Sequence, residues 1–332
     1  MSRLSLSFAC AAYDRVVPLL TGEVGMDGID LNFIVMEDQR QTFDRMAGGL
    51  EFDACEMSSA EIIMNHCRGD SPFVAIPVFV SRVFRHGFVI VNKRSGIKTP
   101  RDLERRRIGV PLFTMSAAVW IRGFLQHEYN VDLSEVTWVQ GAANSAGSHG
   151  HPNVPALLKP ARIVDRLDKS LSQQLEDGDI DAMIGGLLPD SLFHNPDVVR
   201  LFPDYVKVEK AYYAKTKLFP IMHLVAIRRD LYERYPFVAT SLYDGLFRAK
   251  ERALVNMRSL GALRCMLPWL PDHVEEGDRI FNGDPWPYGI EANRPSLEAL
   301  VTYLHEQGMI AFKPKIEDIF APTFGAPMVK YT

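Results

Sequence analysis

The chain contains few cysteines, and their spacing fits no familiar cross-link or metal site. The four cysteines form no CxxC pair and no zinc-type spacing, and they are Cys10, Cys55, Cys67 and Cys265. This pattern predicts reduced, partly buried thiols. It argues against a small fold that disulfides or zinc hold together.

Long hydrophobic runs and an excess of positive charge are also absent. No segment approaches roughly 18 uninterrupted apolar residues, so the sequence predicts no membrane span. The formal net charge is −4, which argues against nucleic acid or an anionic membrane as the main partner. The apolar N-terminal segment alternates like a strand and stops at Asp14 and Arg15 without a convincing cleavage site. We therefore expect a cytoplasmic protein.

The chain does contain a regular alternation of strand and helix patterns. Its 332 residues, 47% of them hydrophobic and 23% charged, suffice for two lobes with separate cores. Expected strands cover residues 4–10, 29–36, 52–57, 73–80, 88–92, 107–110, 136–139, 181–185 and 220–228. Expected helices cover residues 16–24, 41–47, a segment that Gly69 ends, a short turn capped by Thr99, 114–128, 167–175 and a long helix from about 229. This order predicts an α/β protein with mostly parallel sheets, and residues 141–161 are expected to form a long irregular surface loop.

The segment 80–92 places three potential cations between two apolar strand-like runs. Arg82, Arg85 and His86 fall within five positions of one another. Their mutual repulsion and desolvation are unfavourable unless an anion balances them. A guanidinium binds a planar carboxylate in a bidentate fork, so the segment predicts an anion site. The alternative is that these side chains are solvated or paired with the protein's own acids.

Five short motifs resemble the type II periplasmic-binding-protein fold. They are Gly28-Ile29-Asp30-Leu31, Phe52-Asp53-Ala54-Cys55-Glu56-Met57-Ser58, Ile97-Lys98-Thr99-Pro100-Arg101-Asp102-Leu103, Ile108-Gly109-Val110-Pro111 and Leu175-Glu176-Asp177-Gly178-Asp179-Ile180-Asp181-Ala182. The resemblance implies two α/β lobes joined by two crossing strands, with a ligand cleft between them. It places the first lobe at residues 1–93 plus 218–332 and the second at 94–217.

Within that superfamily the chain resembles the 4,5-dihydroxyphthalate decarboxylases. The matching segments are Tyr13-Asp14-Arg15, Glu56-Met57-Ser58, residues 77–86, residues 117–123, Phe219-Pro220-Ile221-Met222-His223 and Gly283-Asp284-Pro285-Trp286-Pro287-Tyr288-Gly289. Val80 departs from the pattern, where the family leads us to expect proline. The last two segments are the most specific of the set.

This resemblance implies cofactor-independent decarboxylation of 4,5-dihydroxyphthalate, or a close catechol carboxylate, to protocatechuate and carbon dioxide in aromatic-acid catabolism. The expected partner is a small aromatic dicarboxylate. An alternative is a non-enzymatic aromatic-acid binding or sensor protein of the same fold, because fold alone does not fix function. Another cytoplasmic enzyme on this fold is a third alternative. The sequence leaves open whether the chain forms a homo-oligomer.

The rule that α/β lobes bind ligands at the carboxyl ends of strands selects Glu56 and His86 as candidate catalytic residues. The family-like segment Phe219-Pro220-Ile221-Met222-His223 adds His223. His86 and His223 are candidate proton donors, because imidazole titrates near neutral pH. His223 lies in an apolar strand expected to cross between the lobes, where a core role is the alternative. Glu56 either accepts a phenolic proton, tunes His86, or balances a neighbouring arginine.

Candidate substrate-binding residues come from the same sheet edge and from the family-like motifs. They are Arg15, Ser58, Arg82, Arg85, Thr114, Ser116, Trp286 and Tyr288. Thr114 and Ser116 open a long helix whose free amides form an anion site, or they act as a plain cap worth roughly 1 kcal/mol. Arg15 binds a carboxylate or pairs with Asp14. Trp286 and Tyr288 wall a flat pocket or fasten the C-terminal helices.

The histidine pair in the irregular loop is a weak metal signal. His149 and His151 form an HxH pattern without nearby acidic partners. We therefore expect both to be polar surface residues, and the sequence predicts no metal site.

Overall fold

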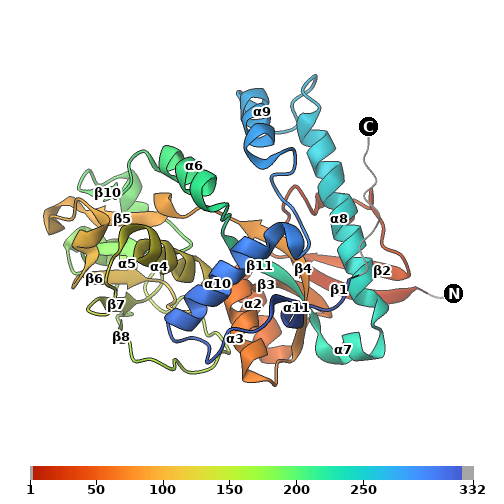
Figure 1. Cartoon of the computed structure of the whole chain (residues 1–332), viewed down its shortest axis with the longest axis horizontal. Coiled ribbons are helices and arrows are strands. Elements are labelled where there is room, and N and C mark those ends of the chain that lie inside the picture. Colours follow the sequence, from red (N-terminus) through yellow and green to blue (C-terminus); the bar gives the residue numbers. More distant parts are fainter. Residues whose placement is uncertain (1–2, 324–332) are drawn as a thin grey trace.

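The computed structural model describes residues 3–323, and they form two lobes built on separate sheets (Figure 1). Figure 1 shows the first lobe at the right, with α8 along its outer side, and the second lobe at the left. Helix α10 (Arg294–Glu306) runs across the junction. Among the helices of the described part of the chain, none has the length and apolar character that a bilayer crossing requires.

The first lobe contains a five-stranded mixed sheet in the order β2-β1-β3-β11-β4. The bounds are β1 Leu4–Cys10, β2 Ile29–Val35, β3 Ala54–Ser58, β4 Phe73–Arg82 and β11 Ile221–Arg228. β1 pairs in parallel with β2 and β3, whereas β11 runs antiparallel to both β3 and β4. The inserted β11 therefore makes this sheet mixed, which corrects the expectation of a mostly parallel one. It also places His223 directly opposite Ser58 on β3.

The second lobe contains a six-stranded sheet in the order β10-β5-β9-β6-β7-β8. The bounds are β5 Val89–Asn92, β6 Arg107–Val110, β7 Thr137–Gln140, β8 Arg162–Asp165, β9 Ala182–Ile184 and β10 Val198–Arg200. β5 pairs antiparallel with β9 and β10, and the other neighbours are parallel. The chain thus enters the second sheet at β5, ahead of residue 94, and returns to the first sheet at β11.

Helices cover both faces of the first sheet and continue its core into the second lobe. α8 (Phe237–Arg258) packs on one face, where its buried aliphatic residues meet Leu6 and Phe8 of β1. α2 (Gln39–Gly49), α3 (Ser59–Arg68) and α10 cover the other face. α4 (Ser116–Tyr129) belongs to the second lobe but shares this core, so α3 and α4 meet at the junction.

The remaining helices are short or lie at the edges of the lobes. They are α1 Val17–Leu20, α5 Leu171–Asp177, α6 Tyr205–Thr216, α7 Arg229–Arg234, α9 Leu270–Phe281 and α11 Ile316–Ile319, with single 3₁₀ turns at His86–Phe88, Lys93–Ser95, Pro100–Leu103, Asp190–Phe193 and Glu291–Asn293. The long helix expected from residue 229 is interrupted at Tyr235. Pro236 follows Tyr235 and disfavours a helical conformation there, so α7 ends and α8 begins anew. Gly69 ends α3 with a φ of 91°, as expected for a left-handed cap.

Candidate active site

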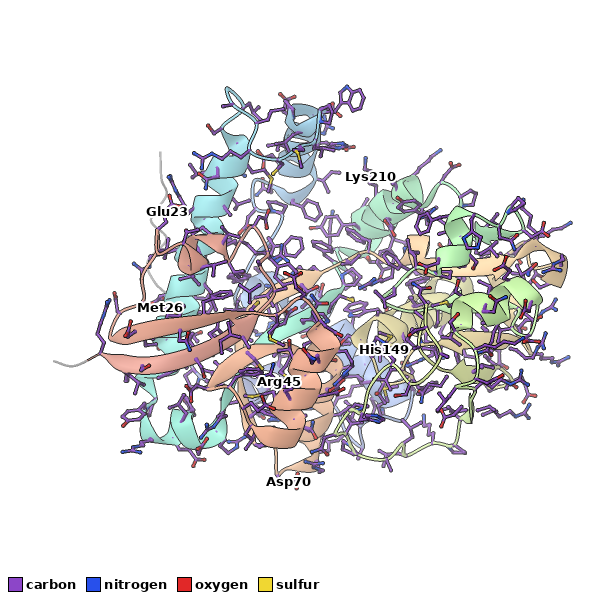
Figure 2. The ribbon with its side chains drawn as sticks, turned by 180° about the vertical axis from the view of Figure 1, so that it is seen from behind. Glu23, Met26, Arg45, Asp70, His149 and Lys210 are labelled. Carbon is purple, nitrogen blue, oxygen red and sulfur yellow. The ribbon has the colours of Figure 1, made fainter. Side chains whose placement is uncertain are left out.

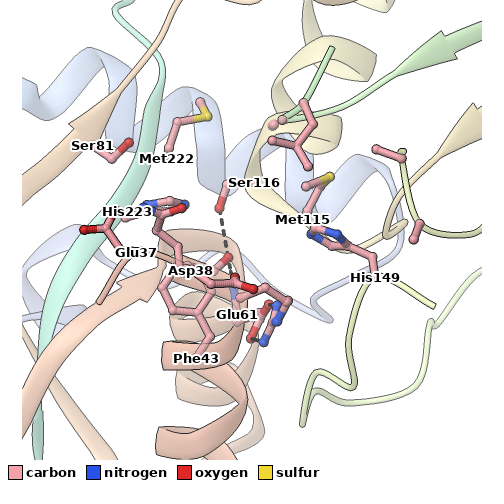
Figure 3. Close-up of a pocket in the computed structure, with 18 of the residues that line it drawn as sticks. Glu37, Asp38, Phe43, Glu61, Ser81, Met115, Ser116, His149, Met222 and His223 are labelled. Atoms are coloured by element: carbon pink, nitrogen blue, oxygen red, sulfur yellow. Dashed lines mark hydrogen bonds and ion pairs between the residues drawn. The ribbon is translucent and has the colours of Figure 1, made fainter. Parts of the chain in front are cut away.

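A cavity of about 720 Å³ is lined by residues from both lobes. The first lobe contributes the start of α2, the start of α3, and residues of β4 and β11. The second lobe contributes the start of α4, the loop 142–149 and Gly186 after β9. Figure 3 shows His223 and His149 on opposite sides of this cavity, with Ser116 between them.

The buried carboxylate of Glu56 holds the ring of His223. Nδ1 of His223 lies 2.6 Å from Oε1 of Glu56, and the Tyr13 hydroxyl donates to the same oxygen at 2.6 Å. The Ala11 N–H donates to Oε2 at 3.3 Å. Burial raises the pKa of Glu56, but the bonds from His223, Tyr13 and Ala11 outweigh it and hold this pKa below its ordinary value. Glu56 is therefore an anion that lies directly against Nδ1 of His223.

Tyr13 and Glu56 have different positions relative to the cavity. Tyr13 and His223 line it, whereas Glu56 lies behind them and is 1% exposed. Burial and the adjacent Glu56 charge raise the pKa of Tyr13, so its hydroxyl stays a donor. Since Nδ1 of His223 faces Glu56, Nε2 is the ring nitrogen left for a ligand. Glu56 is placed to orient this ring rather than to touch a ligand.

The N-termini of α3 and α4 meet at the cavity through hydroxyl groups. Ser58 and Ser116 come from different lobes, and their hydroxyl oxygens are 3.0 Å apart. The Ser116 hydroxyl also accepts from the Ala60 N–H at 3.1 Å. Met115 is the residue before α4, and it provides no side-chain cap. The first-turn amides of α4 therefore have no intrahelical acceptor, and this end of the helix favours an anion.

Arg85 lines the same cavity as a buried cation. Its side chain donates to the Gly186 carbonyl at 3.2 Å, and its guanidinium lies 4.4 Å from the ring of Phe88. Among residues 3–323, no carboxylate forms a salt bridge with Arg85, and burial lowers the pKa of Arg85 to about 9. A bound carboxylate would compensate this buried charge.

The structure places His86 away from the cavity. Its ring stacks on Phe124 with 4.1 Å between centroids, and the rings of Phe202 and Tyr212 contact it edge-on. Neither ring nitrogen has a hydrogen-bond partner among the described residues. Burial lowers the pKa of His86 to about 4, so its ring is neutral at pH 7. His86 thus packs in an aromatic core. This position corrects the expectation that His86 is a proton donor in the cavity.

Arg82 is also turned away from the cavity, into a cluster with the C-terminal aromatic motif. Its guanidinium lies between the rings of Phe79 and Phe219 and donates to the Asn293 side chain. Asn293 in turn donates to the Pro287 carbonyl at 2.9 Å. Arg82 therefore serves packing in this arrangement.

The aromatic motif of residues 283–289 contacts β4 and does not line the cavity. Trp286 Nε1 donates to the Phe79 carbonyl at 2.8 Å. Tyr288 is buried in the core under α8, and its hydroxyl has no partner among residues 3–323. Neither ring lines the cavity.

Arg15 and Thr114 complete the set of candidate residues. Arg15 donates to the Val80 carbonyl, stacks 4.2 Å from the Trp286 ring and pairs with Asp14 at 3.1 Å. Thr114 is buried two residues before α4, outside the cavity lining. The structure thus brings Ser58, Ser116, Arg85 and His223 together and leaves Arg15 and Thr114 apart from them.

Several residues of the cavity wall were absent from the sequence-based candidates. Glu37 and Asp38 lie exposed at its edge, and Arg40 forms a buried pair with Glu61 at 2.5 Å. His149 also lines the cavity and is half-buried, so the expectation that it is a surface residue is wrong. Glu37 and Asp38 follow the end of β2, so the rule on strand ends could have found them. No local pattern marks His149, because its irregular loop reaches the cavity only through tertiary packing. Among residues 3–323, no three His, Cys, Asp or Glu side chains group as metal ligands do.

Comparisons with solved structures concern the fold. The alkanesulfonate-binding protein SsuA from Xanthomonas axonopodis pv. citri is 10% identical, with 96% of this chain and 99% of that chain covered and a TM-score of 0.51. The periplasmic aliphatic sulphonate binding protein SsuA from Escherichia coli is 11% identical, with 100% and 97% covered and a TM-score of 0.52. The predicted two-lobed periplasmic-binding-protein-like fold is therefore confirmed.

Comparisons with curated sequences concern the family. No family model matches the chain. A 4,5-dihydroxyphthalate decarboxylase from Comamonas testosteroni is 33% identical over 324 residues, which cover 97% of this chain and 98% of that protein. A 4,5-dihydroxyphthalate decarboxylase from Pseudomonas putida is 35% identical over 207 residues, covering 61% and 79%. At this identity over nearly its full length, the chain belongs to the 4,5-dihydroxyphthalate decarboxylase family, as its motifs predicted.

Proposed function

We propose that this protein is a carbon–carbon lyase that converts 4,5-dihydroxyphthalate to protocatechuate and carbon dioxide without a cofactor. Membership of the decarboxylase family supports the reaction and the substrate. The observation that carries the proposal is a cavity with two complementary features. Arg85 is a buried cation without a carboxylate partner among residues 3–323, and His223 is backed by a buried anion.

The reaction follows from the electronic structure of the substrate. A hydroxyl para to the departing carboxylate pushes electron density onto the ring carbon that bears this carboxylate. A general acid then protonates that carbon, and carbon dioxide leaves as the ring regains aromaticity. The second carboxylate remains on the product.

The binding of the retained carboxylate is assigned to the basic side of the cavity. Arg85 offers a guanidinium, Ser58 and Ser116 offer hydroxyls, and the first turn of α4 offers free amides. Each charge-assisted hydrogen bond contributes about 1.5–3 kcal/mol. Together these groups favour a dianionic aromatic acid over a neutral ring.

Proton donation is assigned to His223 rather than to His86. The His223 ring lines the cavity, and the Glu56 carboxylate holds its Nδ1, so that Nε2 is free to deliver a proton to a ligand. His86 is surrounded by aromatic rings, where its neutral form is favoured. A positioned acid of this kind typically contributes about 10²–10⁴-fold to the rate.

Two further features belong to the same proposal. We assign the enzyme to the cytoplasm, because all four cysteines are free, as expected in a reducing compartment. The first lobe would end near residue 88 and resume near residue 218, so residues 83–88 and 217–220 would act as the hinge between lobes. Closure of the lobes would exclude water from the cavity.

The test is turnover of 4,5-dihydroxyphthalate by the purified protein, followed as carbon dioxide release and protocatechuate formation. Phthalate is the matched ligand, because it carries both carboxylates but no hydroxyl to drive the reaction. We expect phthalate to bind without losing carbon dioxide. His223→Asn should keep binding and lose at least about 10²-fold in kcat. Binding of 4,5-dihydroxyphthalate without turnover would instead identify a binding protein.

A further inference from the structure

The cavity holds a second imidazole on the wall opposite His223. His149 comes from the irregular loop of the second lobe and lines the cavity near Met115 (Figure 3). Figure 2 shows it where this loop meets the first lobe. Among residues 3–323, its ring nitrogens have no hydrogen-bond partner and no carboxylate within salt-bridge distance. His223, in contrast, is tied to Glu56.

The loop that carries His149 is docked on the first lobe by backbone contacts. The His151 N–H donates to Asp44 of α2 at 3.2 Å, and the Asn65 side chain of α3 donates to the Asn153 carbonyl at 3.0 Å. A Cβ on Gly150 would lie 2.7 Å from side-chain carbons of Arg40, so the backbone approaches α2 closely there. These contacts directly after His149 in sequence therefore hold it at the cavity.

The charged groups around His149 favour its neutral form. Burial and the nearby charge of Arg40 lower the pKa of His149, against the opposing effects of Asp38 and Asp44. Glu61 of α3 also faces the cavity, but its charge is paired with Arg40. A neutral imidazole with a free nitrogen is a proton acceptor.

The proposed reaction requires such an acceptor. The hydroxyl para to the leaving carboxylate donates electrons best after it loses its proton. Glu56 was the candidate for this role from sequence, but it lies behind Tyr13 and His223 and does not line the cavity. The base must therefore come from another residue of the wall.

We propose that His149 is this base: it accepts the proton of the hydroxyl para to the carboxylate that leaves. The inference rests on the proposed function and adds a residue and a role to it. In this arrangement the two imidazoles work as a pair, with His223 as the acid beside an anion and His149 as the base beside a cation. The geometry assigns these roles, because Nδ1 of His223 is held by Glu56 whereas both ring nitrogens of His149 are free among residues 3–323.

The proton and electron balance closes with one proton taken from solvent in each turnover. His149 takes the phenolic proton, and the oxygen lone pair flows into the ring as His223 delivers a proton to the carbon that bears the carboxylate. The bond from this carbon to the carboxylate then breaks, and its electron pair restores the aromatic ring and the phenolate. The phenolate recovers its proton from His149, and His223 is reprotonated from water.

The acidic residues at the cavity edge are the competing candidates. Glu61 is engaged by Arg40, and Asp38 accepts from the Gln41 N–H as the cap of α2. A carboxylate is in general a weaker base than imidazole by about two pKa units, so it matches a phenol less well.

The test compares His149→Asn with His151→Asn, its neighbour in the same loop. His151 has an exposed side chain and uses only its backbone N–H for docking. We expect His149→Asn to lower kcat for 4,5-dihydroxyphthalate by at least about 10²-fold, and His151→Asn to stay within a few-fold of the parent. Phthalate, which lacks hydroxyls, should bind the parent and both variants with similar Kd.

The pH profile distinguishes a base from a residue that only shapes the cavity. In the parent, kcat should fall at low pH as His149 becomes protonated. In His149→Asn this acidic limb should disappear. A retained acidic limb, or a loss of phthalate binding as large as the loss of kcat, would overturn the assignment.

Two further outcomes separate this inference from the proposed function. If the parent decarboxylates 4,5-dihydroxyphthalate and Asp38→Asn, rather than His149→Asn, removes the acidic limb, only the base assignment fails. Asn is itself a good helix cap, so this variant should fold. If the parent binds the substrate and does not decarboxylate it, the proposed function fails, and the base role fails with it.

Discussion

Nδ1 of His223 lies 2.6 Å from Oε1 of Glu56. This contact links a side chain of the cavity wall to a buried carboxylate that is 1% exposed. The two residues belong to the paired antiparallel strands β11 and β3. The contact with Glu56 fixes the orientation of the His223 ring and leaves Nε2 as the nitrogen that faces the cavity. This pairing relates the fold directly to proton donation.

Glu56→Gln should lower kcat by at least about 10²-fold and change KM by only a few-fold. Glutamine keeps a hydrogen-bond acceptor for Nδ1 but removes the negative charge that lies against the His223 ring. The measurement is steady-state kinetics with 4,5-dihydroxyphthalate. Asp53→Asn is the control, because Asp53 accepts from the Ser7 N–H at 2.9 Å just before β3, outside the cavity lining. Equal kcat in Glu56→Gln and parent would contradict the role of Glu56.

Arg85→Lys should affect substrate binding, whereas Arg82→Lys should affect stability. Lysine cannot reproduce a bidentate fork, so Arg85→Lys should raise KM by about 10-fold or more. Arg82→Lys should leave KM within a few-fold and lower the free energy of unfolding, because Arg82 is bonded to Asn293 and packed between Phe79 and Phe219. Kinetics and denaturant unfolding of both variants check this. If Arg82→Lys raises KM and leaves the free energy of unfolding unchanged, Arg82 is a substrate-binding residue after all.

His86 should make stability depend on pH. Burial lowers its pKa to about 4 from the ordinary 6.5, so between these values the unfolded chain binds a proton that the folded chain does not. Stability therefore falls as the pH falls through this window, by at most about 1.4 kcal/mol per pH unit. His86→Phe should remove this loss and keep the stacking on Phe124.

Denaturant unfolding at several pH values between 4 and 7 measures the effect of His86→Phe. The parent protein, measured over the same pH range, is the reference. We also expect kcat of His86→Phe to stay within a few-fold of the parent. A large loss of kcat at unchanged stability would mean that His86 belongs to the active site.

The sequence predicted the elements that have a clear hydrophobic pattern. β1 and β6 have the expected bounds because their apolar residues alternate or run together. β8 was missed because all of its residues are at least partly exposed, so it has no apolar face. It exists because its backbone pairs with the neighbouring strand β7. Such a strand is specified by its neighbour rather than by its own sequence.

The candidate site was predictable where a strand end leads directly into the cavity. The rule that ligands bind at the carboxyl ends of strands selects Ser58 and Arg85, and both line the cavity. The same rule selects His86, which instead turns into a cluster with Phe124 and Phe202. That cluster joins residues far apart in the chain, and no local pattern reports it. His149 was missed for the same reason.

The approach of Gly150 to α2 yields the last prediction. Gly150→Ala would place a Cβ 2.7 Å from Cδ and Cγ of Arg40 and 2.8 Å from Oδ2 of Asp44. Arg40 cannot easily give way, because Glu61 and Asp44 both hold its guanidinium. The loop must therefore move away from α2 and carry His149 with it. We expect kcat/KM to fall by about 10-fold or more, as misplacement of a reacting group does.

Gly147→Ala is the matched control in the same loop. Gly147 also has a positive φ, of 109°, but a Cβ added there would meet nothing within 4 Å. Both variants therefore strain the loop backbone, and only Gly150→Ala adds a clash with the first lobe. If the two variants lose the same activity, backbone strain accounts for the loss and the contact with α2 is dispensable. A larger loss in Gly150→Ala means that the docked loop is what keeps His149 opposite His223.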